Sequence, residues 1–238
     1  MDVTAGADLS FIHLGITIEH MVKNFSIGGF SIAFYGVIIG IGMVCGILVA
    51  QSDAKRRGQD PELYLDFAIY GMLFAILGAR IYYVIFEFNY YVTDLLAIFR
   101  VWEGGLAIHG GIIAGTIFTF FYTKKHNVKF FKLTDILVIC LIIGQILGRW
   151  GNFFNSEAYG PETTLEFLNS ICLPRFIIEG MHINGNYYHP TFLYESLWNL
   201  IGLIILLIVK KYNKNFGLIT SIYLIYYGIG RFLIESLR

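Results

Sequence analysis

Two arginines and a histidine lie inside runs of apolar residues, where a charge is costly. Arg149 and Arg231 stand near the ends of two such runs, and His109 stands near the start of a third. A charged side chain at the centre of a membrane helix costs at least ~2.5 kcal/mol. Arginine offers a rigid fork of donors that matches phosphate oxygens, and it stays charged at any working pH. These residues therefore predict a site for an anionic headgroup.

The sequence around Arg149 repeats polar residues on one face of a helix. Gln145, Arg149 and Asn152 recur at i, i+4 and i+7 and should form a polar stripe. An adjacent stripe consists of glycines, which let a neighbouring helix approach closely: Gly144, Gly148 and Gly151. We expect the polar stripe to face the site and the glycine stripe to pack against another helix.

The composition identifies the chain as an integral membrane protein. Of its 238 residues 56% are hydrophobic and only 14% are charged, and the mean hydropathy is +0.65. Runs long enough to cross about 30 Å of hydrocarbon occur at 30–50, 63–88, 106–123, 134–154, 190–209 and 216–235. We therefore predict an all-α polytopic membrane protein with six transmembrane helices. No cleavable signal peptide is evident in residues 1–29, so the first span should serve as the targeting signal.

The basic residues predict the orientation of the chain. Ten of the seventeen lie in the loops after spans one, three and five, and four lie in the other loops and at the ends. By the positive-inside rule the basic loops are cytoplasmic, and both termini are outside. Residues 1–29 then form an external arm, and residues 30–238 form the membrane domain with an external, irregular loop region at 155–189.

This orientation places most of the polar residues of the spans in the outer half of the membrane. Those not yet named are Tyr35, Arg80, Glu87, Glu195 and Glu235. We expect one outward-facing polar cavity, because unrelated structural residues would scatter over both halves. Structural alternatives remain for single residues. His109 could be a hydrogen-bonded core residue, Arg80 could extend to the interface, and an Arg231–Glu235 pair could only tie helices together.

Several kinds of catalytic site are missing from the sequence. There is no G-x-S-x-G elbow, no H-E-x-x-H and no phosphate-binding P-loop. The three cysteines show neither a disulfide framework nor metal-ligand spacing. We expect no metal, no cofactor and no nucleic-acid partner, and the arginines themselves would stabilise charge on a leaving phosphate.

Six ordered motifs resemble the phosphatidylglycerol–prolipoprotein diacylglyceryl transferase family of bacterial inner membranes. They are F-Y-G at 34–36, G-A-R-I-Y-Y-V at 78–84, W-E-G-G-L-A-I-H-G-G at 102–111, G-R-W-G-N-F-F-N-S-E-A-Y-G at 148–160, H-P-T-F-L-Y-E at 189–195 and G-R-F-L-I-E-S-L-R at 230–238. The resemblance implies transfer of the diacylglyceryl group of phosphatidylglycerol to the thiol of a lipobox cysteine in a prolipoprotein. Glycerol phosphate would be the leaving group.

The resemblance also implies roles for single residues. Arg149 and Arg231 would hold the phosphate and headgroup as catalytic residues, and His109 would be the candidate base or would orient the headgroup. The remaining substrate-binding residues would be Asn152, Gly160, Tyr35, Glu157, Glu235 and Arg80. The resemblance implicates no cysteine of this chain, because the nucleophile would come from the substrate.

The sequence departs from the family pattern at a few positions. Family members usually continue into a seventh span, whereas this sequence stops at Arg238; Ala33 and Phe34 replace a frequent Arg-Trp, and Phe192 replaces a frequent glutamine. Two rival functions predict other features. A lipid or anion transporter would carry polar residues in both halves of the membrane and broken helices near the midplane. A membrane scaffold would tolerate free replacement of His109 and Arg149.

Overall fold

The computed structural model describes residues 9–11, 16–18, 24–27, 30–56, 58–213 and 215–236. Most of the predicted external arm 1–29 lies outside the described residues, as do Arg57, Lys214 and Arg238. The parts of that arm that are described form the short strands β1 (Leu9–Phe11), β2 (Ile16–Ile18) and β3 (Asn24–Ile27). These strands leave the prediction of an external arm untested.

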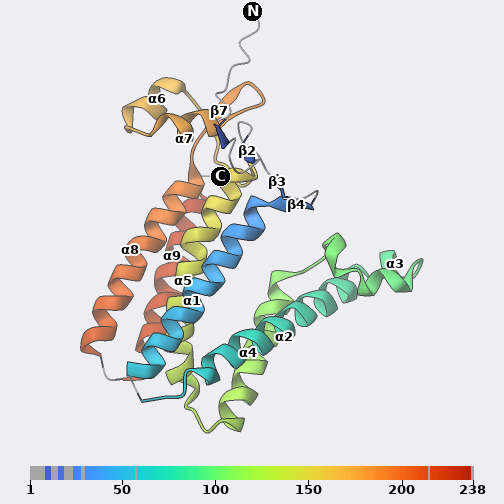
Figure 1. The fold of residues 1–238 in the computed structure, drawn as a ribbon, viewed down its shortest axis with the longest axis vertical. Helices are drawn as coiled ribbons and strands as arrows, with labels where there is room; N and C mark the ends of the chain where they lie inside the picture. The colour runs from blue at the N-terminus through green and yellow to red at the C-terminus, as the bar shows by residue number, and fades with distance from the viewer. Residues whose placement is uncertain are drawn as a thin grey trace, which may run out of the picture. The chain divides into compact units, whose positions relative to one another are not determined.

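A helix forms at each of the six predicted spans (Figure 1). The helices are α1 (Phe34–Arg56), α2 (Glu62–Phe86), α4 (Ile108–Lys125), α5 (Phe130–Phe154), α8 (Thr191–Tyr212) and α9 (Leu218–Glu235). The chain is thus an all-helical polytopic membrane protein. The first span begins four residues later than predicted, because residues 30–33 form strand β4 (Phe30–Ala33), which pairs with β3.

Within the described residues, five helices are long and apolar enough to cross a membrane. They are α1, α2, α5, α8 and α9. Helix α4 is not among them, because its 18 residues include His109 and the lysines Lys124 and Lys125 and are less apolar. The predicted count of six spans and the orientation of the chain therefore stay predictions.

The chain divides into two compact units. The first comprises residues 1–46 and 138–238, and the second comprises residues 47–137. The first unit holds the start of α1, most of α5, and the whole of α8 and α9. The second holds α2, α4 and the segment that connects them.

In the first unit, glycines and aromatic rings bring the helices into close contact. A Cβ atom on Gly202 of α8 would lie 2.5 Å from the Tyr226 ring of α9, so only glycine fits there. Tyr226 and Trp198 stack with ring centroids 4.7 Å apart, and the Tyr226 hydroxyl donates to the Trp198 carbonyl at 2.8 Å. Gly230 of α9 packs against the same indole. Helices α8 and α9 therefore form a tightly packed pair.

A small subdomain lies at the end of α5 and the start of α8 (Figure 1). It contains β5 (Glu162–Thr163), α6 (Leu165–Ser170), α7 (Arg175–Gly180), β6 (His182–Ile183) and β7 (Asn186–Tyr188). Asn184 and Gly185 both have positive φ, as the two-residue turn of a β-hairpin requires. The loop predicted as irregular is thus partly ordered. Its core consists of Phe153, Leu168, Ile177, Ile178, Met181 and Phe192.

In the second unit, α2 and α4 pack closely through small residues. Gly78 of α2 meets Ala114 of α4, and Gly110 of α4 meets the backbone and Tyr82 of α2. The amide of Ala107 donates to the carbonyl of Ala79 at 3.1 Å just before α4 begins. The connecting segment contains α3 (Phe88–Tyr91) and the 3₁₀ turns Leu95–Phe99 and Val101–Glu103.

Candidate functional site

Two arginines from different helices converge on one buried carboxylate. Arg149 Nη2 of α5 lies 2.6 Å from Glu195 Oε2 of α8, and Arg231 Nη1 of α9 lies 3.2 Å from the same oxygen. The Glu195 side chain is only 3% exposed, whereas those of Arg149 and Arg231 are 18% and 34% exposed. The arrangement therefore presents two partly accessible guanidinium groups above a buried anion.

The predicted pair between Arg231 and Glu235 also forms, at 2.5 Å between Nη2 and Oε2. The Glu235 side chain is 57% exposed, so the pair is near the surface of the described chain. Arg231 thus links two carboxylates, one buried and one exposed. Because Arg231 also contacts Glu195 of α8, it joins α9 to α8, and the alternative that the pair only ties helices together stays open.

The polar stripe of α5 continues from Arg149 toward the start of the helix, where Gln145 lies one turn away. Gln145 Nε2 donates to the Tyr223 hydroxyl of α9 at 2.8 Å, and Tyr223 stacks on Tyr227 with ring centroids 5.7 Å apart. Gln145 therefore faces Tyr223 of α9, and Arg149 faces Glu195 of α8. Gln145 and Arg149 thus both contact polar groups of other helices, and the expectation that the whole stripe with Asn152 faces a substrate site stays a prediction.

The glycine stripe of α5 is only partly a packing surface. A Cβ atom on Gly151 would lie 2.5 Å from the Tyr35 ring of α1, and one on Gly42 of α1 would lie 3.5 Å from the Gly144 Cα. A Cβ atom on Gly144 or on Gly148 would meet nothing within 4 Å among the described atoms. Close packing is thus found at Gly151 and, through the approach of Gly42, at the Gly144 backbone, whereas the Cβ positions of Gly144 and Gly148 are open. The Tyr35 ring therefore lies against Gly151, which follows Arg149 by two residues on α5.

The loop after α5 is ordered by its own polar groups. Glu157 Oε1 accepts from Asn152 Nδ2 at 3.0 Å and from Asn155 Nδ2 at 3.4 Å. The backbone supports the turn, since the Glu157 amide donates to the Asn152 carbonyl at 3.0 Å. Asn152 and Glu157 thus lie together, one helical turn beyond Arg149.

Gly160 lies at the junction of this loop with α8. Its amide donates to the His189 carbonyl at 3.0 Å, and a Cβ atom there would lie 2.8 Å from His189 and 2.9 Å from Thr191. The Thr191 hydroxyl in turn donates to the Ala158 carbonyl at 2.7 Å. Gly160 therefore supports the site by close backbone packing, and its buried position leaves its predicted contact with substrate without support.

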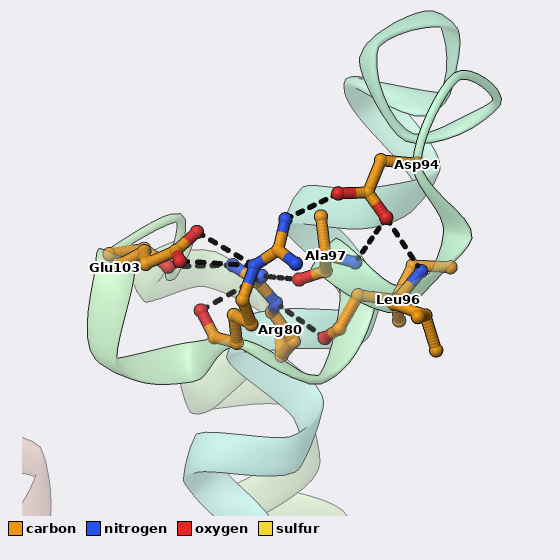
Figure 2. Close-up of polar contacts among 8 residues, drawn as sticks. Arg80, Asp94, Leu96, Ala97 and Glu103 are labelled. Carbon is orange, nitrogen blue, oxygen red and sulfur yellow. Dashed lines mark hydrogen bonds and ion pairs between the residues drawn. The ribbon is translucent and has the colours of Figure 1, made fainter.

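Arg80 is held by the backbone of its own unit, as Figure 2 shows. Its guanidinium donates to five carbonyls, those of Ala97, Ile98, Arg100, Gly104 and Gly105, at 2.6 to 3.3 Å. The residue is only 6% exposed. Arginine has five N–H donors, so none is left for a phosphate. These contacts favour a structural role for Arg80 in fixing the connecting segment, and its binding of substrate stays a prediction.

His109 lies in the first turn of α4, and its ring centroid is 6.2 Å from that of Tyr82. The side chain is exposed within the described chain, and the choice between a base and a hydrogen-bonded core residue stays open. His109 and Arg80 belong to the second unit, whereas Arg149, Glu195 and Arg231 belong to the first. The single polar cavity expected from the sequence therefore stays a prediction.

The described residues contain no group of three or more His, Cys, Asp or Glu side chains that could hold a metal ion. Sequence reasoning placed Glu195 in the expected polar cavity but gave it no role in the site. The sequence did contain a signal for this residue, because Glu195 is an acidic residue inside an apolar run and ends the H-P-T-F-L-Y-E motif. Only the folded chain reveals that both arginines contact it.

Comparisons with known proteins all match this chain to the same family. Residues 23–238 match the family model described as prolipoprotein diacylglyceryl transferase. A phosphatidylglycerol–prolipoprotein diacylglyceryl transferase of Halalkalibacterium halodurans is 48% identical over 89% of this chain and 73% of its own length. A protein of the same name from Bacillus cereus is 47% identical over 89% of this chain and 78% of its own length. A third, from Bacillus anthracis, is 46% identical over the same shares.

Proposed function

Since the chain belongs to the prolipoprotein diacylglyceryl transferase family, we propose that it transfers the diacylglyceryl group of phosphatidylglycerol to the thiol of a lipobox cysteine. The products are a thioether and glycerol phosphate. The observation that carries the proposal is the convergence of Arg149 and Arg231 on Glu195, because it sets two guanidinium groups close enough to hold one phosphate between them.

The chemistry requires stabilisation of charge on phosphate. The substrate thiolate attacks the glyceryl carbon, a carbon–sulfur bond forms, and the carbon–oxygen bond to phosphate breaks with its electron pair on oxygen. The phosphodiester carries one negative charge, and the leaving monoester carries close to two near neutral pH. Interactions that strengthen in the transition state accelerate the reaction, so arginines that contact the phosphate favour bond cleavage.

The thiol must also lose its proton. A free cysteine has a pKa near ~8.5, so a base or a positive field is needed to form the thiolate. In our proposal His109 supplies the base or orients the headgroup, and its exposed position at the start of α4 supports this role. Asn152, Glu157, Tyr35 and Glu235 complete the substrate site as neighbours of the arginines.

The proposed location is the cytoplasmic membrane of a bacterium. The apolar helices place the chain in a membrane with several spans, and the relatives compared above come from bacteria. The proposed partners are phosphatidylglycerol, which enters laterally from the outer leaflet, and the lipobox segment of a prolipoprotein. The positive-inside orientation puts the arginine site at the outer leaflet.

A direct test uses purified protein, phosphatidylglycerol and a lipobox peptide, with mass spectrometry to detect a diacylglyceryl thioether. A peptide with Cys→Ser should gain no diacylglyceryl group, because it lacks the thiol. Arg149→Ala should lower kcat/KM at least ~100-fold while the protein still inserts, as expected for loss of a group that stabilises the transition state. Arg175→Ala, which removes an exposed arginine of α7, is the matched control and should keep its activity. Labelling by Arg149→Ala at the wild-type rate would exclude the proposed function.

A further inference from the structure

Glu195 is a buried anion that the proposed reaction does not use directly. A single oxygen of it contacts Arg149 at 2.6 Å and Arg231 at 3.2 Å, and its side chain is 3% exposed. Because both guanidinium nitrogens lie within hydrogen-bonding distance of one atom, they are within about 6 Å of each other. Two like charges at such a separation repel strongly in a medium of low dielectric constant. The carboxylate therefore offsets the repulsion between the two arginines.

The same carboxylate lowers the attraction of the pair for other anions. Together with Glu235, the cluster has two positive and two negative side chains. A phosphate that binds to the arginines must therefore compete with an anion already in contact with them. Glu235 is a weak competitor, because its side chain is 57% exposed and well solvated. Glu195 is the stronger one, because it is buried and contacts both arginines.

The charge change in the reaction makes this competition important for the product. The phosphate group enters as a monoanion and leaves as a monoester with nearly two charges. Two arginines without a counter-ion would hold the leaving glycerol phosphate more tightly than the substrate, and release of product would limit turnover. The Glu195 carboxylate opposes that effect, because it can form its contacts with the two arginines again when the product moves away.

We propose that Glu195 is a positioning residue that competes with anions for Arg149 and Arg231 and displaces glycerol phosphate from them after transfer. The proposal rests on the proposed function of the chain. It assigns to Glu195 a role in release of product through the two arginines, and no contact with the reacting carbon or sulfur.

The test compares the wild-type protein with Glu195→Gln in lipid nanodiscs. Equilibrium binding of labelled glycerol phosphate gives Kd, and the transfer assay gives KM for phosphatidylglycerol, kcat and the time course of the first turnover. We expect Glu195→Gln to lower the Kd for glycerol phosphate at least tenfold and to lower KM by a smaller factor. Turnover should then slow after a burst of one product per enzyme. Glu166→Gln, which removes an exposed carboxylate of α6 in the same unit, should leave the Kd unchanged.

A purely structural role for Glu195 makes a different prediction. Glu195→Gln would then raise the Kd and lower kcat/KM without a burst, and this result would overturn the proposal. Glu195→Asp is a second variant in case the first does not fold, because it keeps the charge but shortens the side chain by one methylene. It should lower the Kd by a smaller factor, and an unchanged or higher Kd would count against the proposal. Failure of the proposed function is distinguishable, since the wild-type protein would then form no thioether whatever its Kd.

Discussion

At the scale of single residues, Arg80 and Arg149 both lie inside apolar runs but bind different kinds of partner. Arg80 satisfies all its donors with five backbone carbonyls and is 6% exposed. Arg149 contacts a carboxylate and is 18% exposed. A neutral carbonyl leaves a guanidinium with its full charge but occupies its donors, whereas a carboxylate neutralises the charge and can exchange with another anion. The partner of each arginine therefore decides whether it is available to a substrate.

A pH-dependent contact belongs to the same scale. In the segment between α2 and α4, Arg100 donates to Asp94, and this hydrogen bond lowers the pKa of Asp94 below its ordinary value of 3.8. Figure 2 also shows Asp94 accepting from the backbone near Leu96 and Ala97. Because the folded pKa is the lower one, the contact stabilises the segment above the unfolded pKa. That stability is lost as the pH falls through the folded pKa.

We therefore expect acid to loosen this segment. As the pH falls from about 5 to about 2, cleavage by pepsin between residues 87 and 107 should accelerate in the wild-type protein more than it does in Asp94→Asn. The variant lacks the carboxylate and should be cleaved quickly throughout. An equal pH dependence in the two proteins would show that Asp94 does not control the segment. High salt should weaken the effect, because the Asp94 side chain is exposed and that of Arg100 is partly exposed.

At the scale of elements, the approach of α1 to α5 depends on small residues at particular turns. Cys140 Sγ lies 3.0 Å from the Gly46 carbonyl, Gly42 faces Gly144, and Gly151 receives the Tyr35 ring. Helices in lipid lack a hydrophobic force between them, so close backbone packing contributes much of their association. Helix α5 thus uses one face for packing and an adjacent face for the polar stripe.

The two glycines that flank Arg149 on α5 make a matched pair for a test of this packing. Gly151→Ala should destabilise the protein by about 1–3 kcal/mol, because the new methyl group overlaps the Tyr35 ring. Gly148→Ala should be neutral or stabilising by up to ~1 kcal/mol, because the position faces open space and alanine favours a helix. Thermal unfolding in detergent gives both values. Equal destabilisation by the two substitutions would contradict the contact between Tyr35 and Gly151.

At the scale of the whole molecule, the pattern of charge predicts which side of the membrane each loop faces. Basic residues gather at the ends of α1, α4 and α8, including Lys55, Arg56, Lys124, Lys125, Lys210 and Lys211. The small subdomain between α5 and α8 lies at the opposite end of α8 from those lysines (Figure 1). The positive-inside rule then puts this subdomain outside the cytoplasm.

The chain carries its own reporter for this orientation. Cys172 is exposed between α6 and α7, in the predicted external region. A membrane-impermeant maleimide should therefore label it in intact bacteria, or in spheroplasts of bacteria that have an outer membrane. In a Cys172→Ser background, His126→Cys at the end of α4 should be labelled only after the membrane is opened. Labelling of the His126→Cys variant in intact cells would contradict the proposed topology.

The sequence by itself determined the class of fold and named most residues of the candidate site. Apolar runs of sufficient length cannot satisfy their backbone in lipid except as helices, so the six helices were predictable to within a few residues. Arg149, Asn152 and Arg231 were predictable too, because polar residues inside such runs are costly and repeat at helical spacing. The start of α1 and the order within 155–189 were missed, since they depend on local pairing of short strands and on turns.

The tertiary structure decided how the arginines are used. Residue types and helical spacing cannot distinguish Arg80, which binds carbonyls of a distant turn, from Arg149, which binds a carboxylate on another helix. They also left Glu195 among ordinary polar residues, although it joins α5, α8 and α9 at one oxygen. The physical reason is that the energy of a buried charge depends on its partners in space, and packing of separate helices selects those partners.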